Sequence, residues 1–292
     1  MQSTRDIRRR IRTVKSIQQI TRAMEMVAAS RFKRVSGQVV QARPYRTQMR
    51  ELFQDIVVSV PHIDHPLVTK RASRQHICLV IITSDRGLCG AYNAGVIREA
   101  HHFIQSHKDL DIRLVLIGKK GQDYFSRRGY TIERYEPQPL PDRLFPLVQE
   151  MVRVLTKGYE EERFDEVHLF YTQFKTAMSS TPTHLMILPM ENPATAGEIR
   201  STGEPLFEPA VEEILTSFMP RYLESQVYGA VLESAASEQG ARMVAMKNAE
   251  ENAQEMIADL RLTYNRARQS SITKEILEVV SGAEALKSAR RT

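Results

Sequence analysis

The chain has 292 residues, which allows one or two domains, and its 42% apolar content supports a buried core. It holds no run of 18 uninterrupted apolar residues, so we expect no transmembrane helix, and its charged first residues argue against a signal peptide. The two cysteines, Cys78 and Cys89, are too few for a disulfide framework and match no zinc spacing. The sequence therefore predicts an intracellular protein with no metal and no cofactor.

Positive charge is concentrated near the N-terminus. Residues 1–50 hold 13 Lys and Arg against two acids, a net charge of +11, so the other 242 residues carry −5 of the total of +6. Such a basic segment suits nucleic acid, anionic lipid or an acidic cavity in another protein. The alternative is a solvated helix face.

The first predicted element is a long helix over residues 3–58. Ser3 or Thr4 can cap it, and Asp6 lies in the first turn, where the helix dipole favours an acid. Pro44 predicts a kink or a local break. Apolar and small residues recur in steps close to four and three, as in the seam of a left-handed coiled coil. These residues are Ile7, Ile11, Val14, Ile17, Thr21, Met24, Ala28, Phe32, Val35, Val39 and Ala42.

The middle of the chain has the pattern of an α/β layer. Apolar runs bounded by glycine and proline alternate with amphipathic segments, which indicates a mostly parallel sheet. The predicted strands are 76–83, 112–117, 130–135, 166–174 and 183–189, and the predicted helices are 94–106, 122–128 and 144–161.

A second long helix ends the chain. Pro220 suits its first position, and no proline follows from residue 221 to residue 286. At 1.5 Å per residue this segment extends roughly 100 Å, so it needs a partner along its run, and the N-terminal helix is that partner. Its apolar face is expected at Val227, Val231, Ala235, Met243, Met246, Ala249, Ala253, Met256, Leu260, Tyr264 and Ala267.

The predicted fold is therefore α/β, with a long antiparallel α-helical coiled coil formed by the N- and C-terminal helices and a central Rossmann-like α/β domain. We expect the first coiled-coil helix at 1–60, the central α/β domain at 76–190, a linker at 191–209 and the second coiled-coil helix at 210–287.

The turn SDRGLCG, Ser84–Gly90, follows the first predicted strand, where α/β proteins bind phosphates or place nucleophiles. It matches neither G-x-G-x-x-G nor G-x-x-x-x-G-K-[ST], so we interpret it as a tight turn. The alternative is a Rossmann-like enzyme that uses Cys89 as a nucleophile, which would need a nearby base. A further alternative is a basic coiled-coil protein that binds nucleic acid, although the basic segment contains few aromatic residues.

Three stretches of the chain resemble the gamma subunit of F-type ATP synthases. They are ITRAMEMVAASR at 20–31, SDRGLCGAYN at 84–93, and the C-terminal set ESAASEQGARMVAMKNA, YNRARQSSITKEI and VVSGAEAL within 233–286. The stretches follow the family's order of helix, domain and helix. The chain lacks the cysteine-bearing regulatory insertion of the chloroplast members, so the match looks bacterial.

The resemblance implies the central-stalk rotor of F1Fo-ATP synthase, which couples proton-driven c-ring rotation to conformational cycling of the alpha3beta3 hexamer. Catalysis then lies at the alpha/beta interfaces and not in this chain. The implied partners are the alpha, beta, epsilon and delta subunits and the c-ring, without nucleic acid. The implied location is the cytoplasmic face of the bacterial inner membrane, where the chain is peripheral and membrane-associated through the complex.

Individual contacts follow from motif position. The last predicted helical turns, 279–286, resemble the tip that the family seats in a hydrophobic sleeve of the hexamer. The implied contacts with the beta subunit are Met24, Arg268, Gln269 and Thr273, and the implied contacts with epsilon and the c-ring are Tyr45, Leu206 and Phe207.

Overall fold

The computed structural model describes residues 4–59, 65–71, 73–139, 143–190 and 211–289. The chain forms two compact units: the terminal unit, Met1–Val27 with Met243–Thr292, and the central unit, Ala28–Arg242. The elements are α1 (Thr4–Ser59), β1 (His76–Ile82), α2 (Tyr92–Ser106), β2 (Asp111–Ile117), α3 (Lys119–Ser126), β3 (Thr131–Glu136), α4 (Leu144–Glu160), β4 (Glu166–Phe174), β5 (Ser180–Leu188) and α5 (Val211–Ala289).

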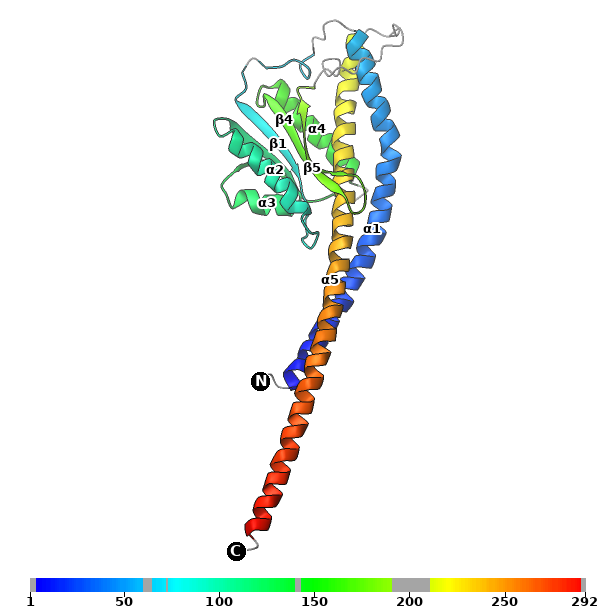
Figure 1. The fold of residues 1–292 in the computed structure, drawn as a ribbon. Coiled ribbons are helices and arrows are strands. Elements are labelled where there is room, and N and C mark those ends of the chain that lie inside the picture. Colours follow the sequence, from blue (N-terminus) through cyan, green and yellow to red (C-terminus); the bar gives the residue numbers. More distant parts are fainter. Residues whose placement is uncertain (1–3, 60–64, 72, 140–142, 191–210, 290–292) are drawn as a thin grey trace. The chain divides into compact units, whose positions relative to one another are not determined.

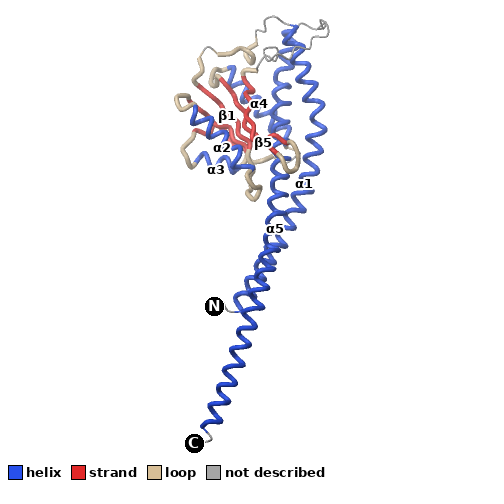
Figure 2. The backbone as a smooth tube through the Cα atoms, viewed as in Figure 1, coloured by secondary structure: helices blue, strands red, loops and turns tan. Residues whose placement is uncertain are grey.

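The strands of the central unit form one five-stranded sheet in the order β3-β2-β1-β4-β5 (Figure 2). β1 pairs in parallel with β2 and β4, β2 pairs in parallel with β3, and only β5 runs antiparallel to its neighbour. The predicted α/β layer with a mostly parallel sheet is therefore confirmed.

Side chains that alternate along the strands enter two separate cores. Ile77, Leu79 and Ile81 of β1 pack with α2 and α3 on one face of the sheet. Cys78 and Val80 pack with α4, α5 and α1 on the other face. Because both faces are covered, the inner strands read as continuous apolar runs rather than as an alternating pattern.

In the central unit, α1 and α5 pack as an antiparallel pair (Figure 1). Phe53 of α1 stacks on Tyr222 of α5 with ring centroids 4.6 Å apart, and Arg46 forms an ion pair with Glu233 at 2.5 Å. In these two contacts the residue number falls along α1 as it rises along α5, as in antiparallel helices. The predicted antiparallel coiled coil is present.

The terminal unit repeats this pairing with polar contacts. Arg8 Nη2 donates to the Tyr264 hydroxyl at 2.6 Å, and Gln18 Nε2 donates to Glu250 Oε1 at 2.9 Å. Figure 1 shows α5 continuing beyond the N-terminal end of α1. The expectation that α5 is paired along its whole run was therefore wrong, because α1 has 56 residues and α5 has 79.

The buried face of α1 follows uninterrupted steps of four and three, so the predicted coiled-coil spacing is correct. Ile17 is a wrong assignment, since it is 47% exposed and the half-buried Gln18 takes its place. On α5, Ile257 is buried where Met256 was expected. The buried or half-buried positions of α1 that keep this spacing are Ile7, Ile11, Val14, Gln18, Thr21, Glu25, Ala28, Phe32, Val35, Val39, Ala42, Arg46, Met49, Phe53 and Ile56.

Two prolines lie inside helices, where each was expected to mark a break or a start. Pro44 sits on an exposed face of the unbroken helix α1, and packing at Ala42 and Arg46 continues across it. α5 begins at Val211, so Pro220 is an interior residue and not the first. In both cases burial of neighbouring side chains outweighs a proline cost of about 3 kcal/mol. The predicted cap Ser3 lies outside the described residues.

Candidate functional site

The part of α5 that extends past α1 carries an uncovered surface. From Arg268 to Ala283 every side chain is exposed. Large apolar side chains on a helix that no other part of the described chain covers mark a protein interface. Those on this segment, between 43% and 72% exposed, are Ile272, Ile276, Leu277, Val279 and Val280.

Three of the predicted contact residues lie together on this segment. Arg268, Gln269 and Thr273 are all exposed. Gln269 and Thr273 are one helical turn apart, and the Thr273 hydroxyl donates to the Gln269 carbonyl at 3.0 Å. The Gln269 amide, the Arg268 guanidinium and the lone pairs of the threonine hydroxyl therefore remain available for polar contacts with another chain.

A second uncovered surface lies on α1 in the terminal unit. Ile17, Ile20 and Val27 are 47%, 59% and 54% exposed, and the predicted contact Met24 is half-buried beside them. Their steps of three, four and three place all four on one face of the helix. Sequence reasoning found Met24 but assigned Ile17 to the seam; the competing signal was Gln18, which fits the four-three spacing.

The remaining predicted contacts are separated from these surfaces in the chain. Tyr45 lies on α1 in the central unit and is 55% exposed. Leu206 and Phe207 lie outside the described residues.

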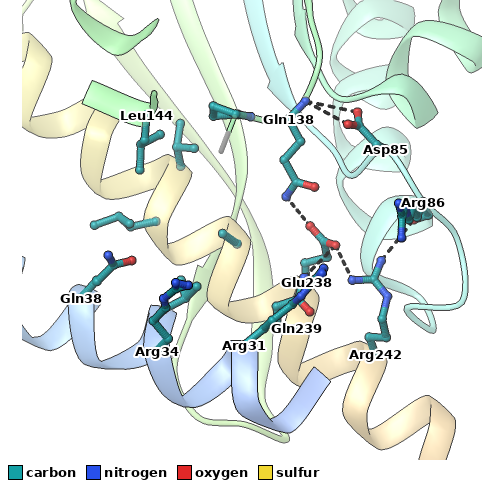
Figure 3. Close-up of a pocket in the computed structure, with 15 residues that line it drawn as sticks. Arg31, Arg34, Gln38, Asp85, Arg86, Gln138, Leu144, Glu238, Gln239 and Arg242 are labelled. Carbon is teal, nitrogen blue, oxygen red and sulfur yellow. Dashed lines mark hydrogen bonds and ion pairs between the residues drawn. The ribbon is translucent and has the colours of Figure 1, made fainter. Parts of the chain in front are cut away.

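A carboxylate from the turn after β1 occupies the N-terminus of α3. Asp85 Oδ1 accepts a hydrogen bond from the backbone N–H of Lys119, the first residue of α3, at 2.9 Å, and both carboxylate oxygens accept from Gln138 N at 3.2 Å (Figure 3). The N-terminus of a helix is where a phosphate would bind. Asp85 therefore occupies the N-terminus of α3 in place of an anion.

The same turn presents acceptors rather than donors to its other side. The carbonyl oxygens of Arg86 and Gly87 each accept from Arg242 of α5 at 3.4 Å. Leu88 and Gly90 have φ angles of 61° and 55°, in the left-handed region. This geometry agrees with the interpretation as a tight turn.

Cys89 does not have the environment of a nucleophile. It is 1% exposed, and Asn93 Nδ2 donates to its sulfur at 3.2 Å. Burial raises the pKa of the thiol, so the thiolate that a nucleophilic cysteine needs is disfavoured. Its described hydrogen-bond partners are Ser84, Asn93 and the Arg86 carbonyl, and none of them is a general base.

The carboxyl end of the sheet is partly covered by α5. In the order β3-β2-β1-β4-β5 the order of the strands reverses between β1 and β4, and such sheets bind ligands at this switch point, beyond the carboxyl ends of the strands. Here α5 covers the carboxyl end of β4. The Thr172 N–H donates to Ser234 Oγ at 3.0 Å, and the Phe174 N–H donates to Glu233 Oε2 at 3.3 Å.

Sequence reasoning missed a cluster of buried polar residues on α5 in the central unit. Glu238, 2% exposed, accepts hydrogen bonds from Gln138, Gln239 and Arg242, and the Arg242 distance is 2.5 Å (Figure 3). The available signal was the charged run within ESAASEQGAR, which has no unbroken polar face. The same run of charged residues is also typical of a solvated helix surface, so its burial could be recognised only from the structure.

Within the residues that the structure describes, no three His, Cys, Asp or Glu side chains gather in a way that could hold a metal ion. Among the described helices, none is apolar over a length that would cross a bilayer.

Comparisons with known proteins connect these features. A family model described as ATP synthase matches residues 3–286. The ATP synthase gamma chain of Heliobacterium modesticaldum is 44% identical, over 98% of this chain and 100% of the relative, and that of Desulfitobacterium hafniense is also 44% identical with the same coverage. The chain belongs to the ATP synthase gamma chain family.

Solved structures agree with this gamma chain assignment. A chain from the central stalk and c-ring of Tetrahymena thermophila mitochondrial ATP synthase is 29% identical, with a TM-score of 0.56 over 79% of this chain and 99% of that one. A chain of the Euglena gracilis mitochondrial ATP synthase, 20% identical, shares the fold with a TM-score of 0.72 over 99% and 96%.

The gamma chain family confirms the resemblance found in the sequence motifs. It favours the central-stalk rotor over both alternatives, the enzyme built on Cys89 and the nucleic-acid-binding coiled coil. The chain is thus a subunit of a membrane-associated complex.

Proposed function

We propose that this chain turns inside an alpha3beta3 hexamer and couples proton-driven rotation of a c-ring to the conformational cycle of the beta subunits. The observation that carries the proposal is the fully exposed segment of α5 from Arg268 to Ala283. An uncovered helix with exposed apolar side chains needs a surrounding partner. Each orientation of such a helix biases the conformational equilibrium of each catalytic site through differential contacts.

The contacts proposed for the beta subunit are Met24, Arg268, Gln269 and Thr273. Polar contacts suit a rotating surface because exposed ion pairs are worth only about 0–1 kcal/mol each, so they form and break cheaply. For epsilon and the c-ring, the proposed contacts are Tyr45, Leu206 and Phe207. The delta subunit completes the proposed F1 sector.

The proposed location is the cytoplasmic face of a bacterial inner membrane, where the chain is held through the complex. We assign the coiled-coil helices to residues 1–60 and 210–287 and the attached α/β domain to 76–190; the predicted linker at 191–209 lies outside the described residues. The α/β domain has a positioning role and no active site of its own. Support for this comes from Asp85, which occupies the N-terminus of α3, and from the buried thiol of Cys89.

Co-purification tests the proposal directly. The chain should bind alpha, beta and epsilon in one complex and hydrolyse no ATP alone. An Arg268→Ala/Gln269→Ala variant should keep the melting temperature of the isolated chain but assemble or couple about tenfold less well, since two polar contacts of about 0.7 kcal/mol each correspond to one factor of ten.

The matched control is Lys247→Ala/Asn248→Ala, which removes an exposed cation and an exposed amide from the same helix. This control should behave like the unmodified chain. Turnover of ATP by the isolated chain, or equal losses in the two double variants, would contradict the proposal.

A further inference from the structure

The segment of α5 that meets the α/β domain buries an unusual number of polar side chains. Six lie between positions 233 and 242, each at most 9% exposed, and we call them the polar cluster. Its members are Glu233, Ser234, Ser237, Glu238, Gln239 and Arg242.

Stability alone does not account for the polar cluster. Replacing buried charged groups with apolar residues of similar volume is often neutral or stabilising, because desolvation offsets the Coulombic gain. The same helix is packed by apolar side chains such as Leu223 and Val227 just before the cluster. The cluster therefore needs an explanation other than the free energy of unfolding.

Five of the six members bond to a defined atom outside α5, whereas Gln239 donates to Glu238 of the same helix. Glu233 accepts from Arg46 of α1 at 2.5 Å and from the Phe174 N–H of β4 at 3.3 Å. Ser234 accepts from the Thr172 N–H at 3.0 Å, and Ser237 donates to the Thr172 carbonyl at 3.3 Å.

The other side of the helix is bonded to the loops of the domain. Glu238 accepts from Gln138, and Arg242 donates to the carbonyls of Arg86 and Gly87 (Figure 3). Successive residues of a helix point about 100° apart, so these bonds hold α5 from several directions around its axis.

The packing is also close just before the cluster, at Gly229, and within it, at Gly240. A Cβ at Gly229 would lie 2.5 Å from Arg46 Cδ, and one at Gly240 would lie 2.9 Å from the carbonyl oxygen of Ala177. At Gly240 a backbone carbonyl therefore approaches α5 more closely than a side chain at that position would allow.

Directional bonds resist a slip in a way that apolar contacts do not. A slide by one turn, about 5.4 Å, or a rotation by one residue would break together all the bonds that join the cluster to α1, β4 and the loops of the domain. Apolar side chains could regain comparable contacts in the new register. We propose that the polar cluster is the joint that holds α5 in one angular register on the α/β domain under load, with Ser234 and Ser237 as positioning residues.

This inference rests on the proposed function, because only a chain that transmits torque is loaded at this joint. The test uses the complete complex in sealed vesicles, with ATP hydrolysis and ATP-driven proton pumping measured together. Ser234→Ala/Ser237→Ala removes both hydroxyl bonds to Thr172 at little cost in volume. The control is Ser225→Ala, since Ser225 is 6% exposed and its hydroxyl has no hydrogen-bond partner among the described residues.

Two neutral hydrogen bonds together contribute about 2 kcal/mol, and every 1.4 kcal/mol corresponds to a factor of ten. Their loss therefore raises the population of slipped registers about 30-fold. The double variant should hydrolyse ATP like the control but pump at least about twofold fewer protons per ATP against a proton gradient. Should it fail to assemble, Ser237→Ala alone serves the same comparison, since it leaves the Thr172 N–H bonded to Ser234.

The outcomes separate the two claims. If the unmodified chain supports pumping but the serine variants pump as many protons per ATP as Ser225→Ala, the proposed joint is refuted while the proposed rotor function is not affected. If the complex with the unmodified chain hydrolyses ATP and never pumps, the proposed function itself fails.

Discussion

The ion pair between Arg46 and Glu233 offers the sharpest test of how the two long helices are held together in the central unit. The side chain of Glu233 is 8% exposed and that of Arg46 is 23% exposed. Glu233→Leu strands a partly buried guanidinium, and Arg46→Met strands a more deeply buried carboxylate. The double substitution removes both charges and leaves apolar side chains in their place.

Removing one partner of a buried pair costs about 3–5 kcal/mol, whereas replacing both is often neutral. Because Arg46 retains contact with water, Glu233→Leu should lie near the lower end, at about 3 kcal/mol, and Arg46→Met should cost more. At roughly 2–4 °C per kcal/mol for a unit of this size, Glu233→Leu should lower the melting temperature by about 6–12 °C. The double variant should regain most of that loss, with a coupling free energy of at least about 2 kcal/mol.

Thermal and urea unfolding of the four chains measures this cycle. Single substitutions that each cost under about 1 kcal/mol, or a double variant whose loss equals the sum of the two, would refute the reasoning. The first result would mean that the pair is effectively solvated, and the second that the two residues do not interact.

Three further predictions concern single residues. Gly229→Ala should destabilise the chain because the added Cβ would displace Arg46. Gly282→Ala should stabilise α5 by up to about 1 kcal/mol, because nothing lies within 4 Å of the added Cβ. Equal effects of the two substitutions in unfolding experiments would contradict this. Cys89 should react with a thiol reagent at pH 8 at least about tenfold more slowly in the folded than in the unfolded chain, because burial raises its pKa; equal rates would show that the thiol is accessible. Burial lowers the pKa of His168 from 6.5 to about 4, so the unfolded chain binds the proton more tightly. The free energy of unfolding should therefore fall by up to about 3 kcal/mol as the pH drops from 6.5 to about 4. His168→Gln should reduce this dependence of the free energy of unfolding on pH. An unchanged dependence would exclude His168 as the cause.

Much of the fold was predictable because local pattern and tertiary environment agree. The apolar runs of β1 and β4 are buried on both faces of the sheet, so their sequence identifies them as inner strands. The coiled coil was recognisable because heptad spacing survives even the proline at position 44.

The errors arise where two residues compete for one position. Ile17 is apolar but lies outside the seam, while the polar Gln18 lies in it because Glu250 of α5 supplies a hydrogen-bond acceptor. The partner's identity at that level of the coil is not contained in the spacing of α1. The same holds for Met256 and Ile257 on α5.

The candidate contact residues were only partly accessible to sequence reasoning. The family motif identified Arg268 and Gln269, and the structure adds that the segment around them is uncovered. The polar cluster was not predictable, because a Glu or Ser in a helix normally faces solvent. Its burial depends on β4 and the turn at 84–90, which are distant in the sequence.

The most direct test of the account is to watch the chain rotate. Met178 is 86% exposed, whereas Cys78 and Cys89 are buried, so a Met178→Cys chain can be labelled selectively with a visible probe. The labelled chain is assembled with alpha and beta subunits that are fixed to a surface. The probe should turn in one direction when ATP is added and stop when the ATP is exhausted. A complex that assembles and hydrolyses ATP while the probe stays still would contradict the claim that this chain is the rotor.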